Sequence, residues 1–141
     1  MKHMRSVAAI MMVVMLMSCF MVVSASAAYD VPEVTTNQAK SVGWTLYIGG
    51  STYEIETGTY VGWGNSGRNV YVVQIACNEL AATRYISCSC GDADGVYGDN
   101  TNAGIKGFQS YCNSIGLYGR DQLVDGVVGP VTWDRFEHYL G

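Results

Sequence analysis

Histidine and basic residues are scarce in this chain. Of its 141 residues, two are His and eight are Lys or Arg, against twelve Asp or Glu. With so few cations the chain has no basic stripe to neutralise phosphates, which argues against nucleic acid and anionic membranes as partners. Beyond residue 27 the one His is His138, so the chain lacks the His-rich pattern of a zinc hydrolase.

Long apolar runs are confined to the beginning of the chain. Residues 1–27 open with Lys2 and Arg5, continue through an apolar run over residues 7–23 and end in small residues, as is typical of a secretory signal peptide. The run is shorter than the roughly 20 residues that a membrane-spanning helix needs. The residues before Cys19 resemble a lipobox, so a lipid anchor is the alternative. We therefore predict a secreted or cell-wall-associated protein with no membrane contact after signal cleavage.

The remaining 114 residues suffice for one small domain and a tail. Because Lys2 and Arg5 leave with the signal, six basic residues face all twelve acidic ones, which gives a net charge of −6. All ten Tyr and all three Trp lie in this part. Their flat apolar faces with a polar edge suit sugars and peptides, although most aromatic residues of a small domain fill its core.

Four cysteines remain after the signal: Cys77, Cys88, Cys90 and Cys112. An even number in a small exported domain predicts two disulfides. A bond between Cys88 and Cys90 would strain a ring with one intervening residue, so Cys77 is expected to bond one of these two and Cys112 the other. A zinc site is the rival interpretation, but only His138 accompanies the thiols. We expect no metal and no other cofactor.

A five-residue pattern occurs twice, as Asp-Gly-Val-Tyr-Gly at 94–98 and as Asp-Gly-Val-Val-Gly at 125–129, at an offset of 31 residues. In a tight turn the Asp side chain accepts a backbone N–H about two residues on, and the Gly tolerates a positive φ. Each copy precedes a helix-like stretch, where Asn100 and Thr101 or Pro130 would supply cap and first-turn chemistry. Two such copies predict a duplicated turn-helix unit.

The sequence predicts an all-α fold preceded by a hairpin. Residues 28–67 form a leader with a β-hairpin over 44–57, closed by a Gly-Gly-Ser turn, and a Gly-rich linker. In this hairpin Trp44, Leu46 and Ile48 would share one face, with Tyr53 and Ile55 opposite them in register. Residues 68–141 form a small three-helix domain with two Asp-Gly turns and two disulfides, because apolar residues recur there at spacings of three and four. The predicted buried stripes are Val70, Val73, Cys77 and Leu80; Ile105, Phe108 and Cys112; and Trp133, Phe136 and Leu140.

Taken in order, these motifs resemble the bacterial peptidoglycan-binding domain of the three-helix type over about residues 68–140. The matching positions are Val70, Val73, Gln74, Cys77 and Asn78; Asp94, Gly95, Tyr97, Gly98 and Thr101; Phe108 and Gln109; and Asp125, Gly126, Gly129, Pro130, Thr132 and Trp133. The chain departs from the family at Cys77, where Leu is usual, and in longer loops before each Asp-Gly turn. These loops lie where they would reshape a ligand groove.

The resemblance implies binding of peptidoglycan, through its glycan or its stem peptide. Most matched residues have structural roles, so the candidates for ligand contact are polar or aromatic residues beside the turns. They are Asn100, Asn102, Tyr111, Tyr118 and Arg120. Arg120 would pair with a stem-peptide carboxylate, and a Tyr would stack on a sugar.

These features together predict a monomeric, non-enzymatic protein that binds the cell wall. One alternative is a small cell-wall hydrolase, in which Glu54 and Glu56 would form the acid and base pair. Another is a module that docks onto a second secreted protein through the edge of the hairpin.

Overall fold

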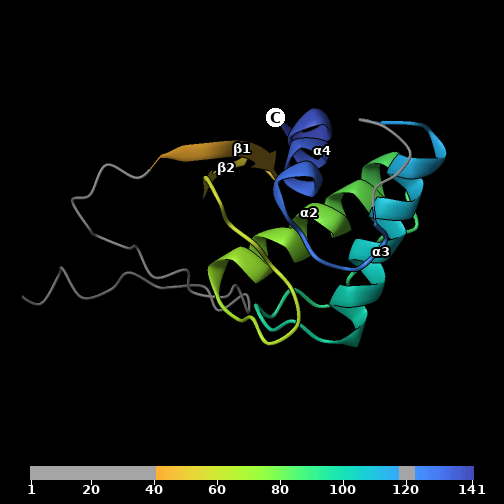
Figure 1. Ribbon diagram of the computed structural model, residues 1–141, viewed down its shortest axis with the longest axis horizontal. Helices are drawn as coiled ribbons and strands as arrows, with labels where there is room; N and C mark the ends of the chain where they lie inside the picture. Colours follow the sequence, from red (N-terminus) through yellow and green to blue (C-terminus); the bar gives the residue numbers. More distant parts are fainter. Residues whose placement is uncertain (1–40, 118–122) are drawn as a thin grey trace, which may run out of the picture.

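The computed structural model describes residues 41–117 and 123–141. The predicted signal peptide and Cys19 lie outside the described residues. The elements, in order, are β1 (Val42–Ile48), β2 (Ser51–Glu56), α2 (Arg68–Arg84), α3 (Asp99–Ser114) and α4 (Pro130–Leu140) (Figure 1). No helix in the described ranges is long and apolar enough to span a membrane.

Strands β1 and β2 form the predicted antiparallel hairpin. Its two-residue turn, Gly49-Gly50, has positive φ at both positions, 57° and 83°, as tight hairpin turns with a matching twist require. Trp44 pairs with Ile55 and Leu46 with Tyr53, which confirms the register that the alternation of apolar residues predicts.

The hairpin is part of the core, so the predicted all-α class is wrong. Its apolar face packs against α4 (Figure 1), where the indole rings of Trp44 and Trp133 stack 6.1 Å apart. Trp44 Nε1 donates a hydrogen bond to Asp134 Oδ1 at 2.6 Å, and the Thr45 N–H donates to Glu137 Oε1 at 2.8 Å. A strand pattern reveals that a hairpin has an apolar face but not what that face covers. Three helices and a two-stranded sheet therefore share one core.

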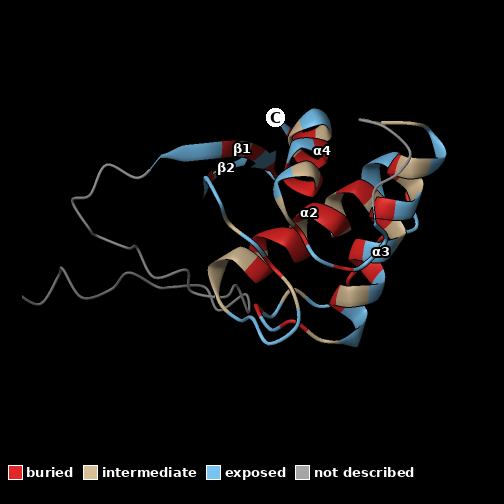
Figure 2. Cartoon of the chain, viewed as in Figure 1, coloured by how far each residue is buried: buried red, intermediate tan, exposed pale blue. Residues whose placement is uncertain are grey.

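The helices bury the stripes that the sequence predicts. Every residue of the three stripes is buried, and Figure 2 shows buried stretches along α2, α3 and α4. The Phe108 and Phe136 rings stack with centroids 4.4 Å apart. Helix α2 continues to Arg84 and ends where Tyr85 adopts a positive φ of 55°.

The four cysteines are free thiols, so the predicted disulfides are wrong. All four are buried. The Cys88 thiol donates to the Cys77 carbonyl at 3.2 Å, and the Cys90 thiol lies 3.8 Å from the Thr101 carbonyl. Hydrogen bonds with the Cys88 and Cys90 thiols, together with burial, raise the pKa of Cys77 well above its ordinary value, while the hydrogen bond with Cys77 lowers the pKa of Cys88. The thiols pack as small apolar side chains in the core. Disulfides were expected to compensate for a small hydrophobic core, but the hairpin enlarges that core instead.

Candidate functional site

The buried Gln74 of α2 holds the first Asp-Gly turn through its side-chain amide. Its Nε2 donates to Asp94 Oδ1 at 3.0 Å, to the Val96 carbonyl at 3.1 Å and to the Thr101 hydroxyl at 2.9 Å. Its Oε1 accepts the Gly95 N–H at 2.8 Å. These bonds join α2, the turn and the first residues of α3 into one unit.

Gln109 of α3 repeats this arrangement at the second turn. Its Nε2 donates to Asp125 Oδ1 at 3.3 Å, to the Val127 carbonyl at 2.9 Å and to the Thr132 hydroxyl at 3.3 Å. Its Oε1 accepts the Gly126 N–H at 3.0 Å. The duplication predicted from the sequence therefore extends to individual hydrogen bonds.

The turn geometry follows the prediction for Asp and Gly but not for the helix caps. Asp94 Oδ1 accepts the Val96 N–H at 2.9 Å, and Asp125 Oδ1 accepts the Val127 N–H at 2.8 Å, two residues on in each case. The N-caps of α3 and α4 are Gly98 and Gly129, and neither helix has a side-chain cap. The Thr101 hydroxyl, which was expected to supply cap chemistry, accepts from Gln74 instead, and the Thr132 hydroxyl accepts from Gln109 in the same way.

One segment, residues 60–66, connects the two turns. Val61 exchanges two backbone hydrogen bonds with Val128, at 3.0 and 2.8 Å. At its other end the segment pairs with the first turn through a bridge between Ser66 and Val96. The stretch predicted as a linker is thus a short clamp, held to each turn by one backbone bridge.

Exposed aromatic and aliphatic side chains gather along this clamp. Tyr60 is 63% exposed and Trp63 59% exposed, and Val96 and Val127 project from the two turns beside them. The Trp63 ring contacts the Tyr97 ring at 5.1 Å, and the Tyr60 ring lies against Gly129. We call these four exposed residues, Tyr60, Trp63, Val96 and Val127, the two-turn surface.

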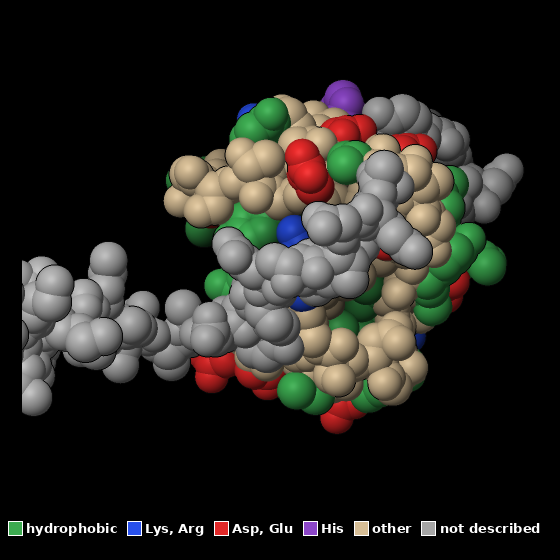
Figure 3. Space-filling view, turned by 90° about the vertical axis from the view of Figure 1, so that its left-hand side faces the viewer, with side chains coloured by type: hydrophobic (Ala, Val, Ile, Leu, Met, Phe, Trp, Pro, Cys, Tyr) green, Lys and Arg blue, Asp and Glu red, His purple; other side chains and the backbone are tan. Residues whose placement is uncertain are grey.

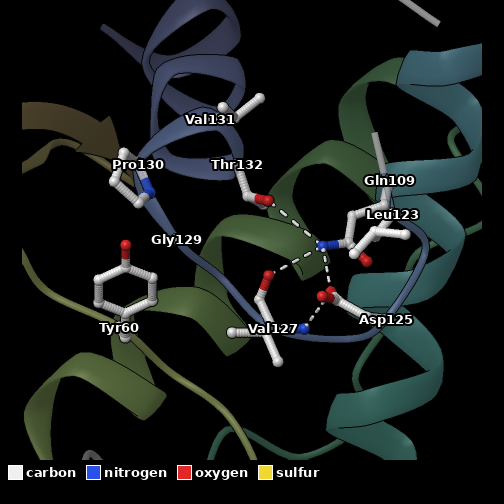
Figure 4. Close-up of a pocket in the computed structure, with 9 residues that line it drawn as sticks. All are labelled: Tyr60, Gln109, Leu123, Asp125, Val127, Gly129, Pro130, Val131 and Thr132. Carbon is white, nitrogen blue, oxygen red and sulfur yellow. Dashed lines mark hydrogen bonds between the residues drawn. The ribbon is translucent and has the colours of Figure 1, made fainter. Parts of the chain in front are cut away.

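A pocket of about 240 Å³ opens beside the second turn. Figure 4 shows Tyr60 and Pro130 on one side of it, Leu123 and Asp125 on the other, and Gln109 behind. Its described walls are mostly apolar, and Asp125 is the one charged residue among the described residues that line it.

An equivalent pocket of about 370 Å³ lies beside the first turn. Gln74, Asp94, Val96 and Thr101 line it in the positions that Gln109, Asp125, Val127 and Thr132 take in the other pocket. The remaining lining differs, because Asp99 and Asn100 stand where the second pocket has Pro130 and Val131. In the described part of the chain, one pocket is therefore acidic and polar, and the other is apolar with a single carboxylate.

The residues predicted to contact a ligand do not form one cluster. Asn100 lines the pocket of the first turn. Asn102 is half-buried, and its Oδ1 lies 3.2 Å from the Tyr97 hydroxyl oxygen. Tyr111 packs near Tyr139 on α4, with ring centroids 6.4 Å apart. The other two candidates, Tyr118 and Arg120, lie outside the described residues.

Sequence reasoning did not select Tyr60 and Trp63 as ligand candidates. They stand in a Gly-rich stretch without helical or strand periodicity, so no predicted core face required them. Large aromatic residues in such a stretch are the signal that could have identified them.

The structure also shows where the two Glu residues considered as an acid and base pair lie. Glu54 and Glu56 are exposed on β2, and neither lines the two pockets beside the turns.

On the face in Figure 3, Lys and Arg side chains are scattered rather than gathered in a patch. Within residues 41–117 and 123–141, no three His, Cys, Asp or Glu side chains are arranged to hold a metal ion.

Comparison of the chain with family models, with curated proteins and with solved structures finds no match in any of the three. The site is therefore interpreted from its own geometry.

Proposed function

We propose that this protein binds bacterial peptidoglycan, without cleaving it, through the two-turn surface. The observation that carries the proposal is the exposure of Tyr60 and Trp63 on a segment that is hydrogen-bonded to both turns. Aromatic rings held on a rigid backbone provide flat apolar contacts for sugar faces and peptide side chains at small entropic cost.

The resemblance to the peptidoglycan-binding domain supports the same proposal. The Gln and Thr positions that match the family's motifs are those whose hydrogen bonds fix the two turns. Glu54 and Glu56, the pair considered as acid and base, line neither pocket beside the turns, so binding alone is the activity proposed.

The test is co-sedimentation of the purified protein with insoluble peptidoglycan. Trp63→Ala and Tyr60→Ala should each weaken binding about tenfold, the loss expected when a central aromatic contact is removed. Tyr47→Ala is the matched control, because Tyr47 is 58% exposed on β1 and lies outside the two-turn surface. Thermal unfolding of each variant checks that the loss of the Trp63 contact with Tyr97 has not unfolded the protein.

A parent protein that stays entirely in the supernatant would refute the proposed function. Equal losses for Tyr47→Ala and Trp63→Ala would refute the assignment to the two-turn surface.

A further inference from the structure

The pocket of the second turn combines apolar walls with the carboxylate of Asp125, of which one oxygen is engaged in hydrogen bonds within the described part of the chain. Asp125 Oδ1 accepts the Val127 N–H at 2.8 Å and Gln109 Nε2 at 3.3 Å. Among the described residues no hydrogen bond reaches Asp125 Oδ2, and no Lys or Arg lines the pocket. The carboxylate is exposed, so its second oxygen is available to a donor from outside.

The walls of this pocket suit a hydrocarbon chain. Tyr60, Leu123, Val127, Pro130 and Val131 contribute apolar surface on several sides (Figure 4). At roughly 30 Å³ for each water-sized group, 240 Å³ accommodates about eight heavy atoms. An extended aliphatic side chain with a polar tip has that size.

A cation fits this site better than an anion. The start of α4 lies in the pocket wall and would favour an anion, although its first residue, Pro130, has no N–H and so offers one donor fewer than another residue would. However, the Asp125 carboxylate repels an anion and pairs with an ammonium group.

We propose that this pocket binds the terminal ammonium and aliphatic stem of a diamino-acid side chain in the stem peptide of peptidoglycan. This inference rests on the proposed function and makes it specific, since it assigns recognition at the second turn to the peptide rather than the glycan. The methylene groups lie against the apolar walls, and the ammonium donates to Asp125 Oδ2.

The experiment is calorimetric titration of the purified protein with a synthetic stem peptide that carries a lysine. The peptide is used with its lysine amine free and with that amine acetylated. Acetylation removes the charge and should weaken binding at least tenfold. Glucosamine oligomers, which carry the same ammonium group on a glycan, are the second arm and should bind no better than the acetylated peptide.

Asp125→Asn keeps the side-chain shape and the turn acceptor but removes the charge. It should lose the preference for the free amine, so that both peptides bind equally weakly. Asp94→Asn is the matched control, because Asp94 holds the first turn in the same way. This control should keep the full preference. If Asp125→Asn does not fold, the two peptides with the parent protein decide the question.

Failure of this inference is distinguishable from failure of the proposed function. Equal binding of the free and acetylated peptides by the parent protein would overturn the inference, as would stronger binding of glucosamine oligomers. In both cases co-sedimentation with insoluble peptidoglycan would still occur. Loss of co-sedimentation itself would refute the proposed function.

Discussion

The two turn units use the same hydrogen bonds but differ in their surroundings. In both units a Gln amide joins an Asp, a Gly N–H, a backbone carbonyl and a Thr hydroxyl. Around these shared hydrogen bonds the two units differ. The position of Tyr97 in the first unit is taken by Val128 in the second, and the first pocket has an acidic lining where the second has apolar walls. The buried framework is thus preserved while the surface of each copy is free to acquire its own ligand chemistry.

The largest expected effect is on the shared framework. Gln74→Leu should lower the free energy of unfolding by about 3 kcal/mol, because it leaves the Gly95 N–H and other turn groups without a partner in the interior. Gln109→Leu should have a similar effect through Gly126, since the two units are equivalent. Urea denaturation measures both.

Lys106→Leu is the control for those two variants, because it is exposed on α3 and should change stability by no more than about 0.5 kcal/mol. The two Gln residues share no partner, so the double variant should show additive losses. A loss below about 1 kcal/mol for either single variant would contradict the framework role.

A smaller effect is expected at Tyr97, where the two units are joined. The Tyr97 hydroxyl of the first unit donates to the Gly126 carbonyl of the second turn. Tyr97→Phe should cost about 1–2 kcal/mol by leaving that carbonyl unsatisfied. Burial raises the pKa of Tyr97 to about 12.

Because this pKa is above the value of about 10 for an unfolded Tyr, the folded state retains the proton more strongly. The resulting stability is complete below pH 10 or so and is lost as the pH rises toward about 12. Denaturation followed from pH 8 to 12 should show a steeper decline for the parent than for Tyr97→Phe. Parallel curves would contradict this assignment.

The smallest expected effect is the pH dependence contributed by Asp94. Hydrogen bonds from Gln74 and from the Val96 N–H lower the pKa of this carboxyl. A lowered folded-state pKa adds stability above the unfolded value of about 4, and this stability is lost as the pH falls through the folded value. Asp94→Asn should therefore show a shallower loss of stability between pH 5 and 2 or so, measured by urea denaturation. An unchanged slope would show that the hydrogen bonds to Asp94 are not stabilising in this way.

Periodicity was sufficient to predict the local elements. The alternation of Trp44, Leu46 and Ile48 identified the hairpin and its register, and spacings of three and four identified the three buried helix stripes. The repeated Asp-Gly pattern also predicted which side-chain oxygen accepts which N–H, because that bond is local.

Periodicity and local motifs could not predict the contacts between residues that are far apart in the sequence. Nothing near Trp44 in the sequence indicates that its ring stacks on Trp133, so the hairpin could not be placed in the core. An even number of cysteines suggested disulfides, but spacing does not fix the distance between two sulfur atoms. Gln74 matched a motif position without revealing its four partners, since these lie about 20 or more residues away.

The pairing of β1 with α4 has a consequence for how the molecule forms. Trp44 and Asp134 are 90 positions apart, and the indole N–H of the first is satisfied by the carboxylate of the second. A contact between residues so far apart forms slowly, because the intervening chain must lose conformational entropy before the contact contributes any stabilising free energy. Until α4 (Pro130–Leu140) is available to pack, the aromatic face of β1 and β2 stays uncovered, so the hairpin completes its folding only together with α4.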